Sequence, residues 1–319
     1  MKHLLLLLSL YSTMLCAQPL SIARFWGNRH AAVSYTFDDG LQDQYTLAFQ
    51  ELRHRGLKAT FAIIGSKVGG VMHSSQDQAM GISGTPCMTW DMLREMAADG
   101  QEISSHGWEH KKVTRLTREQ LRYEVQHNDS IIYEQTGCFP RTYFFPGNSR
   151  DSATLAFCGQ DRVGCRTFQI AIGARRDSTW LNSWVDTLIQ QGQWGVGMTH
   201  GIAMGYDHFA DPQTLWSHLD YVCTRQDLVW VATFHDAAAY IKERDNTQLN
   251  VKQTRHGFEI KPSCSLSPDI FCQPLTLLLD GLDVSTARQG RKPLEIYNNN
   301  GHTMLDFDPH GGKIILKNR

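Results

Sequence analysis

Short apolar runs alternate with amphipathic stretches along the chain from Ala31 to about Arg244. The apolar runs predict strands at 31–37, 58–64, 101–105, 142–145, 162–168, 195–199 and 228–232. The amphipathic stretches predict helices at about 41–54, 89–100, 117–135, 180–191, 212–223 and 235–244. This repeated alternation of strand and helix indicates an α/β architecture with parallel strands, most simply a barrel.

Two local signals refine this pattern. Thr117 followed by Gln120 has the spacing of a capping box, so we expect a helix to begin there. Residues 65–87 are rich in Gly and Ser and predict a long loop. Loops of this length in compact domains are usually functional or mobile.

The pattern changes after Asp245. Alternating runs at 275–279, 294–297 and 313–317 are separated by turn signals such as Asp280-Gly281, which is typical of β-hairpins. The sequence therefore predicts an α/β domain at 18–246 and a small all-β C-terminal appendage at 247–319. The appendage has four aromatic residues and no Trp, which favours a role in shielding the barrel over a role as a carbohydrate-binding module.

The first residues have the pattern of a secretory leader. Met1–His3 is short and positively charged, Leu4–Leu10 is apolar, and small residues lead up to Ala17. We expect a signal peptide at 1–17 and a secreted or periplasmic protein. Lipid attachment at Cys16 is the weaker alternative, because Leu15 is larger than lipoprotein signals usually tolerate. No later segment has eighteen consecutive apolar residues, so we expect no membrane span.

Composition narrows the possible partners. Lys and Arg total 31 against 32 for Asp and Glu, and this near-neutral balance argues against a nucleic-acid binder. Seven cysteines follow the leader without a Cys-x-x-Cys spacing, so a thiolate zinc site is not expected. Cys158 with Cys165, and Cys264 with Cys272, are close enough in sequence to form disulfides. The 14 histidines raise the question of metal binding, which composition alone does not answer.

Three polar stretches follow predicted strands. Asp38 and Asp39 end the first strand, where neighbouring side chains diverge and two carboxylates can take different roles. His106 and His110 follow the third strand and would share one face if the segment were a helical turn, so that both could bind one cation. His200 follows a late strand. Because active sites of barrels lie at the C-terminal ends of the strands, the three stretches point to one face. Taken singly, each could also be a solvated turn or a surface histidine.

Together these stretches resemble the polysaccharide deacetylases with a NodB-homology domain, carbohydrate esterase family four. The resemblance spans about residues 30–244. The family's Thr-Phe-Asp-Asp-Gly motif matches at 36–40, its His-[Ser/Thr]-x-x-His motif matches at 106–110 with Gly107 in the Ser/Thr position, and its late His matches at His200. The resemblance implies a deformed (β/α) barrel with seven or eight parallel strands and a groove open to polymer.

The same resemblance implies roles for individual residues. Asp39, His106 and His110 would bind a divalent metal, with Zn²⁺ preferred and Co²⁺ or Ni²⁺ as alternatives. Asp38 would be the general base and His200 the general acid. The substrate would be an acetylated glycan.

The third and fourth motifs of the family are met only in part. The third carries an Arg a few residues before a Pro, and Phe144 stands where that Arg belongs. Arg141 has the wrong spacing, so Arg166 or Arg175 from another strand would have to replace it. The fourth motif, whose Asp tunes the acid histidine, is loosely matched by Asp177.

The function implied is a secreted metal-dependent hydrolase that removes acetyl groups from a polysaccharide or oligosaccharide, with N-acetyl sugars favoured. An O-acetyl esterase acting on plant or host glycans is an alternative with the same ligand set. A non-catalytic carbohydrate-binding protein is another, which the missing Arg favours and the retained Asp38 and His200 oppose. Aromatic residues near the motifs could stack on sugar rings, namely Trp108, Tyr143, Trp180 and Tyr206. The loops 65–87 and 201–211 are the expected determinants of substrate choice.

Overall fold

The computed structural model describes residues 20–73, 84–173 and 176–319. Its larger sheet has eight strands in the order β8-β7-β6-β3-β2-β10-β9, with β11 also paired to β2, and every pairing in it is parallel. The strands are β2 (Ala31–Phe37), β3 (Thr60–Ile63), β6 (Glu102–Ser105), β7 (Thr142–Phe144), β8 (Gly164–Arg166), β9 (Ile170–Ala171), β10 (Trp194–Thr199) and β11 (Val229–Val231). This confirms the predicted α/β class with seven or eight parallel strands.

The sheet is curled into a partly open barrel. Its two edge strands, β8 and β9, are separated by residues 167–169 alone. A link of that length spans at most about 14 Å, so the two edges must lie near each other. No ladder joins them in the described part of the chain. The barrel therefore has a seam between β8 and β9.

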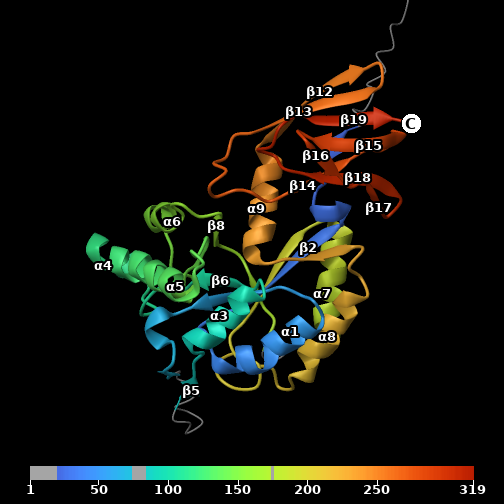
Figure 1. Ribbon diagram of the computed structural model, residues 1–319. Coiled ribbons are helices and arrows are strands. Elements are labelled where there is room, and N and C mark those ends of the chain that lie inside the picture. The colour runs from blue at the N-terminus through green and yellow to red at the C-terminus, as the bar shows by residue number, and fades with distance from the viewer. Residues whose placement is uncertain (1–19, 74–83, 174–175) are drawn as a thin grey trace, which may run out of the picture.

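Helices cover the outside of the sheet (Figure 1). The longer ones are α3 (Trp90–Ala98), α5 (Asn128–Thr136), α6 (Ser152–Cys158), α7 (Ser178–Gln191), α8 (Gln213–Cys223) and α9 (Phe234–Asp245). A π-helical turn, η2 (Gln44–Phe49), runs into α1 (Gln50–His54), while α4 (Arg118–Arg122) and the π-helical η5 (Tyr123–His127) precede α5. The main core cluster joins strand residues such as Phe37 and Phe61, whose rings stack 4.9 Å apart, to apolar residues of these helices.

The sequence predicted local structure correctly where the hydrogen bonds join residues that are close in sequence. Thr117 accepts the N–H of Gln120 and the Gln120 side chain accepts the N–H of Thr117, so the predicted capping box is confirmed. Prediction missed α6, β9 and a short hairpin of β4 (Val71–Met72) with β5 (Thr85–Pro86) inside the expected loop 65–87, part of which lies outside the described residues. The seven cysteines are free thiols, so neither candidate disulfide is formed.

The C-terminal part forms two antiparallel sheets. One has the order β12-β13-β19-β15-β16 and the other β1-β14-β18-β17. Their strands are β1 (Ser21–Ile22), β12 (Thr247–Thr254), β13 (Gly257–Cys264), β14 (Leu275–Leu278), β15 (Val284–Gln289), β16 (Lys292–Leu294), β17 (Tyr297–Asn299), β18 (His302–Phe307) and β19 (Ile314–Asn318). The N-terminal strand β1 pairs with β14, which the sequence did not predict because so short a strand has no apolar period.

These sheets share one buried cluster with the barrel. Leu277 and Leu305 come from one sheet and Ile260 and Leu316 from the other, and the same cluster contains Tyr240 of α9. Figure 1 shows α9 running from the barrel towards the two sheets. The Tyr240 hydroxyl donates to the carbonyl of Ala23 at 2.9 Å. The C-terminal part is thus attached through an apolar contact surface.

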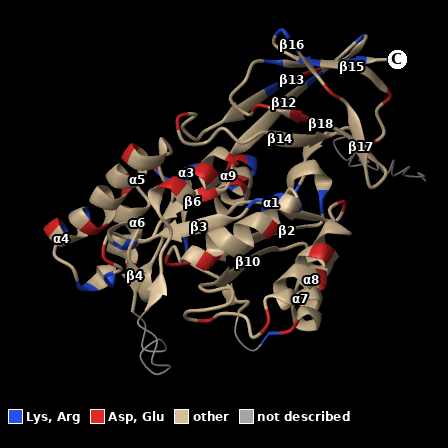
Figure 2. Ribbon diagram, turned by 60° about the horizontal axis from the view of Figure 1, so that its bottom comes forward, with Lys and Arg blue, Asp and Glu red and all other residues tan. Residues whose placement is uncertain are grey.

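Acidic and basic residues both occur on the barrel helices and on the C-terminal strands (Figure 2), and the net charge of the chain is −1. Among the described residues, no helix is long and apolar enough to cross a membrane. The predicted signal peptide at 1–17, with Cys16, lies outside the described residues.

A buried carboxyl lies where α9 meets the C-terminal part. Glu243 is fully buried, accepts the N–H of Gln273 at 2.9 Å, and lies 3.6 Å from Nε2 of His310. Burial raises the pKa of Glu243 to about 7, the N–H of Gln273 partly offsets this, and the charge of Asp308 adds to it. Because the folded-state pKa lies above the ordinary 4.5, the protonated form is favoured and stability falls as pH rises through this interval.

We therefore expect Glu243→Gln to raise the melting temperature at pH 8 more than at pH 5. The amide keeps an acceptor for Gln273 and carries no charge, and about 1 kcal/mol corresponds to a shift of about 2–4 °C in a domain of this size. Thermal unfolding at both pH values measures it, with Glu295→Gln, at an exposed position, as the control. An equal change in melting temperature at both pH values would contradict the raised pKa of Glu243.

Candidate functional site

Five of the six predicted site residues line one cavity at the C-terminal ends of the barrel strands. Asp38 and Asp39 follow β2, His106 and His110 follow β6, and His200 follows β10. The cavity has a volume of about 460 Å³. Its other lining residues are Met72, His73, Phe145, Gly147, Asn148, Arg166, Gln169, Met198 and Tyr206.

Asp39, His106 and His110 converge as a candidate metal site. Oδ1 of Asp39 lies 3.5 Å from Nε2 of His106 and 3.6 Å from Nε2 of His110, and the three potential ligand atoms all lie within 4.8 Å of one another. Oδ1 of Asp39 is buried without a hydrogen-bond partner, which is costly unless a cation occupies the site. Two imidazoles and one carboxylate suit a borderline divalent cation.

The state of His106 also fits a metal ligand. Its Nδ1 lies 2.8 Å from the carbonyl oxygen of Phe144, so Nδ1–H donates there and Nε2 faces Asp39 with its lone pair. Burial lowers the pKa of His106 to about 4, although the nearby carboxylates act in the opposite direction. The imidazole is therefore neutral at pH 7, as a metal ligand must be.

The backbone around His106 and His110 differs from the prediction. The segment is a loop and not a helical turn, because Gly107 and His110 have φ angles of 82° and 61°. The buried carboxylate of Glu124 holds this loop by accepting the N–H groups of Glu109 and Lys111 at 3.0 and 2.9 Å. A Cβ at position 107 would lie 2.6 Å from Oε1 of Glu124. This contact explains why Gly replaces the Ser or Thr of the motif.

Glu124 was missed by the sequence analysis, although a signal for it was present. It lies three residues after Leu121 in a helical segment, next to Val125, and both of these neighbours are buried. A carboxylate on the buried face of a helix needs donors, and here the loop that carries His110 supplies them.

Arg166 takes the place of the missing Arg of the third motif. Its Nη1 donates to Oδ1 of Asp38 at 2.7 Å and to Oγ1 of Thr36 at 2.8 Å, and its Nη2 donates to Oδ2 of Asp38. Both charged side chains are almost fully buried. Burial alone would raise the pKa of Asp38, but the charge of Arg166, followed by that of His106, holds it well below its usual range. Asp38 is thus an ionised, buried carboxylate.

Phe144 occupies the position expected for the family's Arg and supports the replacement. The Arg166 guanidinium lies 4.0 Å from the centre of the Phe144 ring, a distance typical of a cation–π contact. Arg141, which has the wrong spacing in the sequence, donates to the carbonyl groups of Asp161 and Asp269. Arg175 lies outside the described residues.

His200 completes the described cavity. Its ring packs edge-on against Tyr206 with 4.9 Å between ring centres. Its Nδ1 is buried without a hydrogen-bond partner, so Nε2 is the ring nitrogen that can reach the cavity. Asp177 does not join this group: its Oδ1 accepts the N–H of Trp180 and caps α7.

Of the four aromatic residues predicted to stack on sugar rings, one lines the cavity. Tyr206 lines the cavity and is about half exposed, at 53%. Tyr143 is fully buried, so it belongs to the core and cannot stack on a sugar. Trp108 packs against His127, and Trp180 lies under the guanidinium of Arg176.

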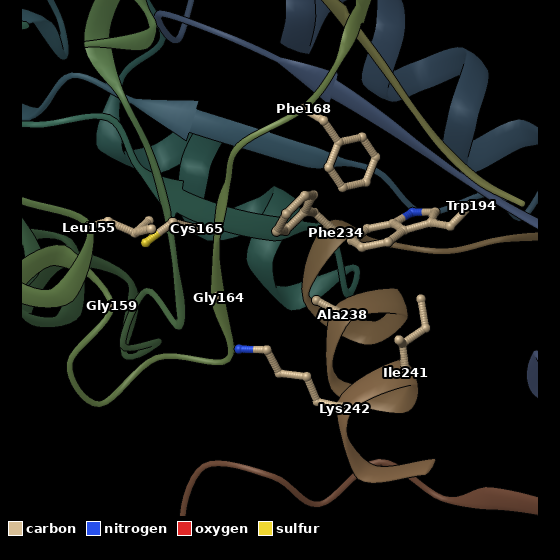
Figure 3. A pocket seen from close by; sticks show the side chains of 10 residues that line it. All are labelled: Leu155, Gly159, Gly164, Cys165, Phe168, Trp194, Phe234, Ala238, Ile241 and Lys242. Atoms are coloured by element: carbon tan, nitrogen blue, oxygen red, sulfur yellow. The ribbon is translucent and has the colours of Figure 1, made fainter. Parts of the chain in front are cut away.

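A second cavity, of about 370 Å³, has a different character. Figure 3 shows Phe168, Trp194 and Phe234 grouped on one side and Lys242 reaching towards the strand at Gly164. Gly164 and Trp194 are the first residues of β8 and β10, so this cavity lies at the opposite end of the sheet from Asp38. Its lining residues include no carboxylate and no imidazole, so it lacks the set of groups that lines the first cavity.

The family model for polysaccharide deacetylases matches residues 27–161. This part of the chain is similar to that family. YxkH of Bacillus subtilis, whose name assigns it to the polysaccharide deacetylases, is 32% identical over 108 residues, which cover 33% of this chain and 34% of YxkH. The peptidoglycan-N-acetylglucosamine deacetylase PgdA of Listeria monocytogenes is 23% identical over 111 residues, which cover 34% of this chain and 20% of PgdA.

The matches therefore span about a third of the length of YxkH and a fifth of PgdA. Among solved structures, a crystal structure titled as a polysaccharide deacetylase from Mycobacterium smegmatis has a TM-score of 0.53 at 14% identity, covering 74% of this chain and 98% of that chain. At this identity the likeness concerns the fold, and it agrees with the partly open barrel of parallel strands.

The buried Asp38–Arg166 pair makes a prediction about stability. Arg166→Met should lower the free energy of unfolding by about 3–5 kcal/mol, because it leaves a buried carboxylate without its counter-charge. The double variant Asp38→Asn with Arg166→Met should recover part of this loss, since no unpaired charge remains. Urea unfolding of the metal-free protein measures both.

The exposed pair of Lys313 and Glu259 provides the control, and Lys313→Met should change stability by less than about 1 kcal/mol. If the double variant were as unstable as Arg166→Met alone, the loss would come from packing of the Arg side chain and not from the unpaired charge.

Proposed function

We propose that the protein is a metal-dependent hydrolase that removes acetyl groups from an acetylated glycan, with N-acetyl sugars as the favoured substrates. The observation that carries the proposal is the convergence of Asp39, His106 and His110 beside an ionised Asp38 and across one cavity from His200. The relatives include proteins named as deacetylases of peptidoglycan N-acetylglucosamine and of chitin, which supports the choice of an N-acetyl sugar.

The metal is proposed to be Zn²⁺, held by Asp39, His106 and His110, with Co²⁺ or Ni²⁺ as alternatives. Neutral imidazoles and a single carboxylate favour such borderline cations over the hard cations Mg²⁺ and Ca²⁺. When bound, the cation would polarise the acetyl carbonyl and lower the pKa of a water molecule from about 16 to about 7.

Asp38 is the proposed general base. Its carboxylate is ionised and held in one orientation by Arg166, and its Oδ2 lies 3.9 Å from Nε2 of His106. It can therefore take a proton from a water molecule beside the candidate ligands. His200 is the proposed general acid, because its Nε2 can reach the cavity and give a proton to the departing nitrogen or oxygen. Asp177, predicted as the partner of His200, has no contact in the described residues that supports this role.

The rim of the cavity would contact the sugar. Tyr206 from the loop 201–211 and Met72 and His73 from the predicted loop 65–87 lie there with Asn148 and Gln169. The backbone N–H groups of Phe145 and Gly147 are the proposed donors to the oxyanion, because both residues line the cavity.

We further propose that residues 1–17 direct secretion, and that residues 18–246 and 247–319 are two domains. The supported role for the C-terminal part is structural, because its buried cluster is continuous with that of the barrel at Tyr240. N-terminal sequencing of the exported protein should give Gln18 as its first residue.

Acetate release tests the proposal. The wild type, supplied with Zn²⁺ or Co²⁺, should release acetate from chitin oligomers or peptidoglycan, and acetylated xylan distinguishes the O-acetyl alternative. Asp38→Asn should lower the rate by about 10²–10⁴-fold, the range for loss of a general base. Asp283→Asn, at an exposed Asp, should leave the rate unchanged.

The binding-protein alternative makes the opposite prediction. A wild type that binds these glycans but releases no acetate from any of them, with either metal, would overturn the hydrolase. An Asp38→Asn variant with full activity would overturn only the assignment of the base.

A further inference from the structure

Gln44 connects the backbone of the two proposed acid–base residues. It is the first residue of η2, is fully buried, and is not among the residues that line the cavity. Its Nε2 donates to the carbonyl oxygen of Asp38 at 2.6 Å and to the carbonyl oxygen of His200 at 2.7 Å. One buried side chain therefore joins the ends of β2 and β10.

A primary amide supplies both donors of this arrangement without adding a charge. The two acceptors are carbonyl oxygens, and an –NH₂ group has two hydrogens to give them. The opposite orientation of the amide would place Oε1 against both carbonyl oxygens. A carboxylate of the same shape would be repelled by both, and a shorter amide would not reach from η2.

The neighbouring Asp43 holds the same segment from its other side. Its Oδ2 accepts the N–H groups of Ile202, Ala203 and Met204 at 2.7, 2.9 and 3.2 Å. This segment is tightly folded, since a Cβ at Gly201 would lie 1.8 Å from the carbonyl oxygen of Met204. Asp43 thus takes the N–H groups that follow His200, while Gln44 gives hydrogens to the carbonyl of His200 itself.

The backbone hydrogen bonds between β2 and β10 end just before the two carbonyl groups that Gln44 contacts. The last parallel contact is the hydrogen bond from the N–H of Asp38 to the carbonyl of Thr199, at 3.0 Å. Beyond it, the chain at Asp39 turns with a φ of 76° and the chain at His200 leaves the sheet. Without a further connection, the two reactive side chains would be carried by two independent loops.

We propose that Gln44 is a positioning residue that fixes the distance between Asp38 and His200 across the substrate. This inference rests on the proposed hydrolase function, in which one residue takes a proton and the other gives one to the same acetyl group. Displacement of either loop would lower the rate of the chemical step more than it would weaken the binding of substrate or metal.

Two variants and a matched control test this role. Gln44→Met removes both hydrogen bonds without adding a charge, and Gln44→Glu places a carboxylate against the two carbonyl oxygens. Gln50→Glu is the control, because it makes the same chemical change at an exposed position close in sequence. The measurements are kcat and KM for acetate release, the affinity and visible spectrum of bound Co²⁺, and the melting temperature.

We expect Gln44→Met to lower kcat about 10-fold, because two hydrogen bonds are lost. Gln44→Glu should lower kcat about 100-fold, because its carboxylate is in addition repelled by the two carbonyl oxygens. KM should stay within about 3-fold, because Gln44 does not line the cavity and so makes no contact with the substrate. Loss of one hydrogen bond to the substrate itself would change KM by about that factor or more. The Co²⁺ spectrum and affinity should change much less than kcat, because the side chains of Asp39, His106 and His110 are all kept. Gln50→Glu should behave as the wild type.

Two results would overturn the positioning role. In one, both Gln44 variants keep the kcat of an active wild type. In the other, kcat, Co²⁺ affinity and melting temperature fall together, which is the behaviour of a residue that only supports the fold. If wild type and Gln50→Glu both release no acetate, the proposed function itself fails, and the positioning role fails with it.

Discussion

The buried ion pair of Asp38 and Arg166 is the interaction on which the site depends. Two charges removed from water are stable only when their geometry is good, and the two parallel hydrogen bonds of a guanidinium with a carboxylate provide it. The pair keeps Asp38 ionised and fixes its orientation. Asp39 is then free to turn, through a left-handed backbone, towards His106 and His110. Two adjacent carboxylates thereby obtain different environments.

This pair also depends on the curvature of the sheet. Arg166 ends β8, which is four strands away from β2 in the sheet order, so its side chain reaches Asp38 only because the barrel curls. Phe144, on the neighbouring strand β7, lies beneath the guanidinium along this path. The interior of a small barrel is filled by side chains, and here one of them is the charged side chain of Arg166. A charge that the resemblance led us to expect on β7 is therefore supplied by Arg166 of β8.

The sequence predicted those features that are encoded locally. Asp38, Asp39, His106, His110 and His200 each follow an apolar run, so parallel strands bring them to one end of the barrel. Arg166 could only be one candidate of two, because its partner is 128 positions away in sequence. The histidines at 106 and 110 converge without the helical turn that their spacing suggested, because Gly107 and the contacts of Glu124 set that loop. The roles of Gln44 and Glu124 depend on loops packed against their helices, which periodicity does not reveal.

A crystal structure of the protein grown with Zn²⁺, with diffraction recorded on both sides of the zinc absorption edge, tests the central claim most directly. The account predicts one anomalous peak, about 2.0–2.2 Å from a carboxylate oxygen of Asp39 and from Nε2 of His106 and of His110. Asp38 should lie beside this peak without binding it and should remain paired with Arg166. A site without a peak, or a peak bound by Asp38 in place of Asp39, would contradict the account.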